Sequence, residues 1–191
     1  MPTEIIPPQI LHRLFRYEPE TGRLWRRTRT PDLFRDGKRS AVHRCHAWNM
    51  QWAGKRAFTT CAFNGYYVGS VFDRGHLAHR VIWAMQTGEW PEHEVDHINH
   101  DRLDNKWVNL RPATRLINRQ NQTLFKNNTS GHVGVCWSKA SKKWRAKIRA
   151  GNKYVHLGLF PNKDDAIAAR KGAEIKYGFH PNHGKVLHTW T

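Results

Sequence analysis

The chain has 191 residues and is strongly basic, with 32 Lys and Arg against 15 Asp and Glu and a formal net charge of +17. Its hydrophobic content of 39% and its nine Trp are too rich in core-forming side chains for a disordered protein. Apolar runs stay short of the roughly 18 residues of a membrane helix, and the first residues lack a signal-peptide layout. We therefore expect a globular intracellular protein without a membrane partner.

The positive charge is concentrated at the two ends of the chain. Residues 1–60 carry 12 Lys and Arg against 5 acidic residues, residues 61–122 carry 7 of each, and residues 123–191 carry 13 against 3. Such segments attract polyanions, because each phosphate that they neutralise releases condensed counterions. We favour nucleic acid as the partner over a merely solubilising surface. An anionic membrane would call for a long basic amphipathic helix, which the sequence does not offer.

The first half of the chain predicts short helices and strands. Apolar residues within 9–16 are spaced as on one side of a short helix, and the Pro and Gly of "YEPETGRLW" predict a turn before a strand. Residues 28–56 receive no assignment. Strands with turns at Asn64-Gly65 and Asp73-Arg74-Gly75 are expected next, followed by a helix that begins near His79 and ends before Gly88.

A strand–loop–strand–helix pattern occupies residues 95–122. Residues 95–98 alternate as a short strand, a polar loop runs to about Lys106, and "WVNL" at 107–110 predicts a second strand. Pro112 suits the first position of a helix over roughly 112–121, because the first helical residue needs no N–H. These elements predict a small ββα unit.

The C-terminal part predicts a three-stranded antiparallel sheet packed on one helix. The strand candidates are "HVGVCWS", "KKWRAKIRA" and "KYVHLGLF", and the helix lies between Asn162 as N-cap and Gly178. In the second strand Arg145, Lys147 and Arg149 alternate with apolar residues, so one face of the sheet is expected to be cationic. In the third strand, one face is expected to hold Val155, Leu157 and Leu159, and the other Tyr154, His156 and Gly158.

These elements together predict an α+β protein built from several small parts. The predicted parts are a basic N-terminal region (1–60), a central core (61–122), a linker (123–130), a sheet domain (131–180) and a tail (181–191).

The central unit offers the side chains that phosphodiester hydrolysis needs. Hydrolysis requires a base that deprotonates water and a cation that neutralises charge on the phosphoryl oxygens. His97 suits the base, because an ordinary imidazole is largely neutral at cellular pH. Asp96 is a hard oxygen ligand for Mg²⁺ or Mn²⁺. A further ligand must come from elsewhere, and Asn118 on the predicted helix is a candidate.

The same stretch resembles the HNH endonucleases, specifically their phage and intron homing branch. Asp96-His97, Asp104-Asn105, Asn109-Leu110-Arg111 and Asn118 match the HNH pattern in order, and the resemblance extends over about residues 15–122. It implies that Asp96 and Asn118 hold one divalent metal ion, that His97 is the general base, and that Asn109 braces His97 and its loop. It implies no small-molecule cofactor.

His100 departs from the HNH pattern, and His79 allows two interpretations. Many relatives have Gly at the position of His100, so we expect an unusual backbone conformation there, with a contact to the phosphate backbone as the alternative. His79 is either a substrate contact or a packed core residue.

Residues 129–178 resemble the ethylene-response-factor, or APETALA-type, DNA-binding domain. The resemblance rests on Gly134-Val135, Trp144, Ala146, Ile148, Leu157-Gly158 and Phe160. It implies that one sheet face reads bases in the major groove, with Arg145, Lys147, Arg149 and His156 at reading positions. Lys142, Lys143 and Lys153 are expected to meet phosphates, which position the protein without specifying sequence.

The sequence thus predicts a metal-dependent HNH endonuclease of the homing type that nicks double-stranded DNA, as a monomer or a dimer. It is expected in the cytoplasm, that of the host if a phage encodes it. The alternative is a DNA-binding regulator whose nuclease unit no longer cleaves, and a weaker one is a nuclease directed at RNA.

Overall fold

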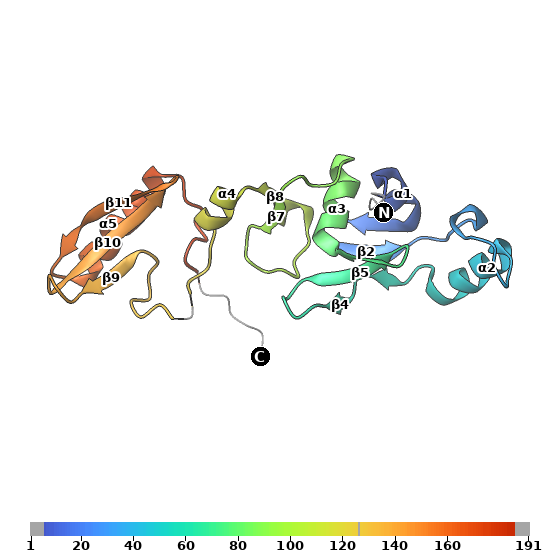
Figure 1. Ribbon diagram of the computed structural model, residues 1–191, viewed down its shortest axis with the longest axis horizontal. Helices are drawn as coiled ribbons and strands as arrows, with labels where there is room; N and C mark the ends of the chain where they lie inside the picture. The colour runs from blue at the N-terminus through green and yellow to red at the C-terminus, as the bar shows by residue number, and fades with distance from the viewer. Residues whose placement is uncertain (1–5, 126, 186–191) are drawn as a thin grey trace. The chain divides into compact units, whose positions relative to one another are not determined.

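The computed structural model describes residues 6–125 and 127–185, which divide into two compact units (Figure 1). The N-terminal unit comprises the chain up to His97 together with Asp101–Pro112. The C-terminal unit comprises Ile98–His100 together with the chain from Ala113 onward. Those parts of the predicted N-terminal region, linker and tail that fall on residues 1–5, 126 and 186–191 lie outside the described residues.

The N-terminal unit mixes short helices with two small antiparallel sheets and the β7–β8 pair, so the α+β prediction is confirmed. One sheet has the order β1-β2-β3, another β4-β5-β6, and β7 pairs with β8. The helices and strands, in chain order, are α1 (Pro8–Leu14), β1 (Phe15–Glu18), β2 (Arg23–Arg26), the 3-10 turn η1 (Pro31–Leu33), α2 (Ala41–Trp52), β3 (Arg56–Ala57), β4 (Thr60–Cys61), β5 (Tyr67–Val71), β6 (Arg74–Leu77), α3 (Ala78–Thr87), β7 (Glu94–His97), the 3-10 turn η2 (Trp107–Asn109) and β8 (Leu110–Ala113).

One hydrophobic core runs through the N-terminal unit. Leu11 and Leu14 of α1 and Ile82 of α3 are fully buried in it, and Val95 of β7 and Leu110 of β8 belong to the same cluster. The strands of the predicted ββα unit are therefore anchored by apolar residues that come from nearly the whole N-terminal unit. The burial of Val95 in this core fixes the position of β7 and so of its polar residues Asp96 and His97.

Most predicted helices are confirmed, with shifted ends. The first predicted helix, 9–16, is α1 and stops at Leu14, because Phe15 turns into β1 and is buried. The predicted helix from near His79 to Gly88 is α3, and Gly88 ends it with a φ of 80°. The unassigned segment 28–56 contains η1 and α2, which pack together through the rings of Phe34 and Trp48.

Two details of the predicted ββα unit are wrong. Residues 107–109 form η2, so the second strand begins only at Leu110. Pro112 lies inside β8, where a short strand tolerates a residue without N–H. The helix α4 (Arg115–Gln120) begins after Thr114, whose hydroxyl accepts a hydrogen bond from the Ile117 N–H at 3.4 Å. This side-chain cap sets the start of the helix beyond Pro112.

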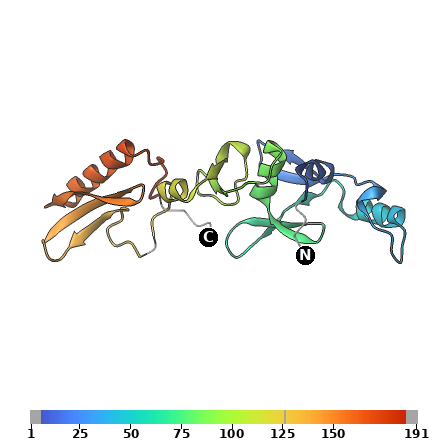
Figure 2. The ribbon, with the colours of Figure 1, turned by 45° about the horizontal axis from the view of Figure 1, so that its top comes forward.

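The C-terminal unit contains the predicted sheet on one helix, and Figure 2 shows α5 (Lys163–Lys176) along one face of β9 (Val135–Ser138), β10 (Lys143–Ala150) and β11 (Lys153–Phe160). The strand order is β11-β10-β9, and Ala146 and Ala166 are fully buried between sheet and helix. The predicted end at Gly178 is confirmed, with a φ of 66°.

The predicted alternation of β11 is wrong in its second half. A β-bulge between Ala146 and Lys147 shifts the register, so that Gly158 opposes Ala146 while His156 opposes Lys147. Because a one-residue shift moves every later side chain to the other face, Leu159 lies opposite Arg145 on the outer face and is 40% exposed. Val155 keeps its predicted place opposite buried Ile148.

Within the described residues, no helix is both long and apolar enough to cross a bilayer.

Candidate active site

His97 ends β7 and is almost completely buried, with 2% of its surface exposed. Its Nε2 lies 2.9 Å from Oδ1 of Asn105. An amide oxygen only accepts, so this contact places the ring proton on Nε2 and the lone pair on Nδ1. Burial lowers the pKa of His97 below its ordinary 6.5, and the Asn105 bond and the Asp96 carboxylate act in the opposite direction. The ring is therefore neutral at neutral pH, the form that a general base needs.

Asn105 is held in place by the β1–β2 hairpin. The Tyr17 hydroxyl donates to the Asn105 carbonyl at 2.8 Å, and the Trp107 N–H donates to the Pro19 carbonyl at 3.3 Å. Burial and the charge of Asp104 raise the pKa of Tyr17, so it stays a donor. At the hairpin turn, Gly22 has a φ of +70°, and a Cβ there would lie 2.5 Å from the carbonyl carbon of Asn105. Only glycine allows this approach.

Asn109 supports the loop from inside. It is buried, and its Nδ2 donates to the carbonyl of Asp104 at 2.7 Å. That Asn109 braces His97 stays a prediction. Asn105, to which the sequence assigned no role, also bonds the His97 ring with its side chain. The signal for it was present, since Asp104-Asn105 belongs to the matched pattern, but only the fold reveals that its amide reaches the imidazole.

Asp96 forms an ion pair that the sequence did not predict. Its Oδ2 accepts hydrogen bonds from Nη2 of Arg111 at 2.8 Å and from Nε at 3.2 Å. About a fifth of each side chain is exposed, 21% for Asp96 and 22% for Arg111. The two residues stand on neighbouring strands, β7 and β8, which explains why residues far apart in sequence meet. A guanidinium thus already balances the charge of the predicted metal ligand.

Two more rings surround His97. The ring centroid of His79 lies 5.1 Å from that of His97, and the Tyr66 ring lies 5.8 Å from His97 and 4.9 Å from His79. His79 is 4% exposed, which confirms the packed alternative for this residue. Burial first, and then the neighbouring charges of His97 and Arg80, lower the pKa of His79 to about 3. It is a neutral wall of the His97 site.

The remaining predicted ligand, Asn118, lies on α4 in the C-terminal unit, whereas Asp96 lies in the N-terminal unit. Their pairing around a metal ion stays a prediction. The described residues contain no group of three or more His, Cys, Asp and Glu that could hold a metal ion. Hard oxygen donors such as Asp96 and Asn118 fit Mg²⁺, which commonly takes one or two carboxylates and completes its shell with water and phosphate oxygens.

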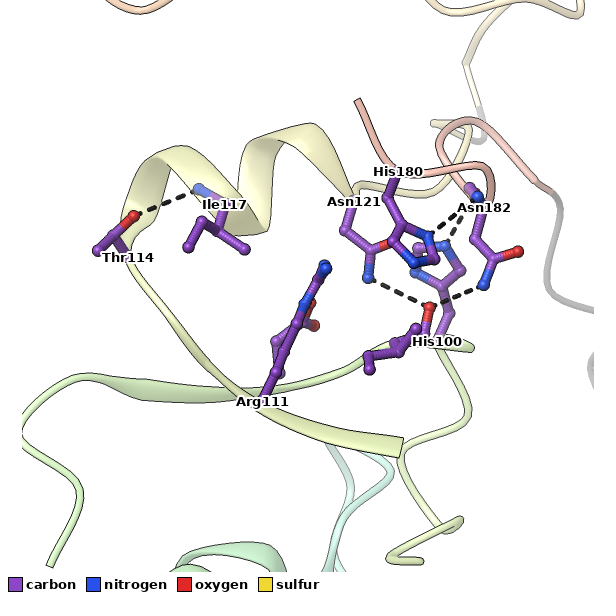
Figure 3. Close-up of polar contacts among 9 residues, drawn as sticks. His100, Arg111, Thr114, Ile117, Asn121, His180 and Asn182 are labelled. Carbon is purple, nitrogen blue, oxygen red and sulfur yellow. Dashed lines mark hydrogen bonds and ion pairs between the residues drawn. The ribbon is translucent and has the colours of Figure 1, made fainter. Parts of the chain in front are cut away.

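His100, in the C-terminal unit, has a φ of 67°, so the expected unusual backbone conformation is confirmed. Figure 3 shows its ring beside Asn182, to whose carbonyl the His100 Nε2 donates at 2.9 Å. The Ile98 carbonyl accepts from Nδ2 of Asn182 at 2.9 Å and from Nδ2 of Asn121 at 3.4 Å. The loop that follows His97 is therefore bonded to residues near the C-terminus.

The predicted reading positions lie on one face of the C-terminal sheet. Arg145, Lys147 and Arg149 alternate with buried Ala146 and Ile148 along β10, and exposed His156 is the cross-strand partner of Lys147. The Tyr154 ring lies under Lys147 and Arg149, at 5.1 and 5.4 Å from their charged groups. The predicted phosphate contacts Lys142, Lys143 and Lys153 are all exposed around this sheet.

Comparisons with known proteins agree with the central motif. Residues 76–120 match a family model described as HNH endonuclease. Protein 3.8 of Escherichia phage T7 is 36% identical over 83 residues, which are 43% of this chain and 69% of that protein. No solved structure matches the chain significantly.

The close approach of Gly22 to Asn105 gives a paired test. Gly22→Ala and Gly54→Ala both place an alanine at positive φ, +70° and +76°, but only the first meets backbone atoms, because Gly54 has no atom within 4 Å of a Cβ. We expect each variant to lose about 1 kcal/mol from the backbone, and Gly22→Ala to lose roughly 1–3 kcal/mol more from the collision. Urea unfolding measures the loss, and the ¹⁵N shift of His97 Nε2 reports its bond to Asn105. Equal losses with an unchanged shift would contradict the proposed support of Asn105.

Acid should destabilise the fold through His79. Above its ordinary pKa of 6.5 the imidazole is neutral whether folded or unfolded. Below pH 6.5, His79 is protonated in the unfolded chain but stays neutral in the folded protein, where its pKa is about 3. The unfolded state therefore binds more protons, and the unfolding free energy falls as the pH falls. His79→Gln should therefore reduce the pH dependence of the unfolding free energy between pH 6 and 4 by up to about 1.4 kcal/mol per pH unit. Urea unfolding across this range measures it. His93→Gln, which replaces an exposed imidazole, serves as the control, and an equal change of slope in both variants would contradict the role of His79.

Proposed function

The chain belongs to the same family as Protein 3.8 of Escherichia phage T7, and from its HNH endonuclease domain at residues 76–120 we propose that it is a metal-dependent DNA endonuclease of the homing type. The observation that carries this proposal is the buried, neutral His97, held by Asn105 next to the Asp96 carboxylate. A buried imidazole kept neutral within a matched nuclease motif is what proton abstraction from water requires.

His97 acts as the general base through Nδ1. The Nδ1 lone pair takes a proton from a water molecule as the water oxygen attacks phosphorus, and the bond from phosphorus to the 3′ oxygen breaks. The products are a 5′-phosphate and a 3′-hydroxyl, which receives its proton from solvent. Asn105 contributes by accepting a hydrogen bond from the Nε2–H group, which keeps the basic lone pair on the other nitrogen.

Asp96 and Asn118 would hold one Mg²⁺ or Mn²⁺ ion by their side-chain oxygens, as the HNH resemblance implies. When bound, such an ion neutralises charge on the phosphoryl oxygens and on the departing 3′ oxygen. Arg111 keeps the Asp96 carboxylate oriented through its two hydrogen bonds and adds a fixed positive charge beside it. This charge favours the approach of a phosphate.

Duplex DNA would be held by the basic ends of the chain. In the C-terminal unit, the face with Arg145, Lys147, Arg149 and His156 is proposed to enter the major groove, with the surrounding lysines on phosphates. In the N-terminal unit, a groove of about 540 Å³ between α2 and the segment before it is lined by exposed Lys38 and Arg39. This groove is proposed to lie against the DNA backbone.

One HNH site cuts one strand in each encounter, so we propose nicking as the reaction of a single chain. The ion pair of Asp96 with Arg111 favours a second candidate, a DNA-binding regulator that does not cleave, because a guanidinium competes for the carboxylate oxygen that a metal ion needs. Cleavage under divalent ions separates the two candidates.

His97→Ala should abolish nicking and leave DNA binding intact. Supercoiled plasmid with Mg²⁺ or Mn²⁺ measures nicking, and filter binding measures affinity. Removing one general base is expected to lower the rate by about 10²- to 10⁴-fold, and a chelator should stop the wild type. His93→Ala, which removes an exposed imidazole near the same strand, should cut like the wild type. If the wild type binds DNA but fails to cleave it under any divalent ion, the protein is instead the non-cleaving regulator.

Arg149→Ala and Lys153→Ala should affect different properties of DNA binding, the first its sequence preference and the second its salt dependence. Loss of a base contact at Arg149 should weaken binding by about 1–3 kcal/mol and relax the sequence preference at one position. Loss of a phosphate contact at Lys153 should weaken binding to all sequences alike and reduce the slope of log affinity against log salt by about 1. Binding to a random-sequence duplex library at several salt concentrations measures both. Lys171→Ala, on the exposed side of α5, should change neither, and identical effects of all three variants would contradict the proposed face.

A further inference from the structure

The segment that follows α5, residues 177–185, is bonded along its length to the loop Ile98–His100 and to α4; we call it the C-terminal strap. Asn182 contacts the loop twice, donating from Nδ2 to the Ile98 carbonyl and accepting from His100 Nε2, each at 2.9 Å (Figure 3). Three further hydrogen bonds join the strap to the end of α4 and the residues after it: His180 N–H to Gln120 O at 3.3 Å, Gly184 N–H to Gln122 O at 2.9 Å, and Gln120 Nε2 to Tyr177 O at 3.1 Å.

The strap is anchored on its other side in the sheet domain. The His183 side chain is 2% exposed, and its Nε2 accepts a hydrogen bond from Arg170 Nη2 at 3.0 Å. Arg170, itself buried in α5, also donates to the Lys147 carbonyl in β10 at 3.2 Å. Lys147 is one of the residues whose side chains face outward for DNA. A continuous series of contacts thus runs from β10 through Arg170 and the strap to the loop.

The loop depends on such support for two reasons. His100 adopts a φ of 67°, which costs energy for a residue with a side chain, so neighbouring contacts must hold it there. The Ile98 carbonyl belongs to the residue that directly follows His97, and it accepts two side-chain amides, from Asn182 and Asn121. These two hydrogen bonds fix the direction of the Ile98 carbonyl and therefore the backbone conformation directly after His97.

We propose that the C-terminal strap positions the catalytic loop, so that the sheet domain is required for cleavage itself and not only for DNA binding. Asn182 is then a positioning residue, because it acts on His97 through Ile98. This inference rests on the proposed nuclease function. It explains why His100 is tolerated at a position where glycine would be relaxed, since its ring bonds the strap in return.

The test compares Asn182 variants in the full chain. Asn182→Ala removes the donor to Ile98, and Asn182→Asp keeps the size of the side chain but faces the Ile98 carbonyl with an acceptor. The matched control is Lys185→Ala, because exposed Lys185 donates to the Asn182 Oδ1 at 2.6 Å without touching the loop. Single-turnover nicking with saturating DNA measures the rate, and filter binding measures the affinity.

We expect Asn182→Ala to lower the single-turnover rate about tenfold or more and Asn182→Asp to lower it further, while DNA affinity stays within twofold of the wild type. Lys185→Ala should cut at the wild-type rate. At His100, glycine should retain more activity than alanine, because both lose the bond to Asn182 but glycine relieves the positive φ. Wild-type rates in both Asn182 variants, or equal losses in rate and affinity, would overturn the proposal.

Hydrogen exchange separates this proposal from the nuclease proposal. Amides of residues 98–101 should exchange faster in Asn182→Ala than in the wild type and in Lys185→Ala, whether or not the protein cleaves DNA. If exchange is faster in Asn182→Ala but the wild type never nicks DNA, the strap does support the loop, and only the proposal that this support serves cleavage is refuted. Unchanged exchange would refute the strap's hold on the loop even in an active nuclease.

Discussion

The hydrogen bond between the His97 ring and the Asn105 amide is the interaction on which the nuclease motif depends. A buried imidazole has two possible tautomers, and only a partner on one nitrogen decides which of them carries the lone pair. Asn105 decides it, and Asn105 is placed by a hairpin more than 80 residues earlier, through the Tyr17 hydroxyl and the close approach of Gly22. The short turn in "YEPETGRLW" is thus part of the support of the site.

Charge is organised on two scales in this protein. Over the whole chain, the basic residues are concentrated in the two terminal segments of the sequence and the centre is neutral, which favours a polyanion as the partner of those segments. At the site, Asp96 is balanced locally by Arg111, and His97 and His79 avoid charge by burial. Most basic residues thus lie outside residues 61–122, whereas the carboxylate and the two imidazoles of the site lie within them.

Local sequence predicted the elements better than their ends and pairings. The helix α3 is marked by apolar periodicity and by Gly88, and both signals act within one turn of chain. Pro112 looked like a helix start, yet Thr114 provides the cap and β8 takes the proline, because pairing with β7 outweighs the local preference. The bulge in β11 moved Leu159 to the cationic face, and strict alternation cannot anticipate an extra residue in one strand.

The sequence by itself determined the α+β class, the HNH pattern with Asp96, His97 and Asn109, and the alternating cationic residues of β10, because each depends on residue type and short spacing. Only the tertiary structure decided which amide meets His97, that Arg111 meets Asp96, and that Asn182 meets the loop at Ile98. These partners are brought together by burial of a shared core and by strand pairing, and such contacts between distant residues leave no local periodicity in the chain.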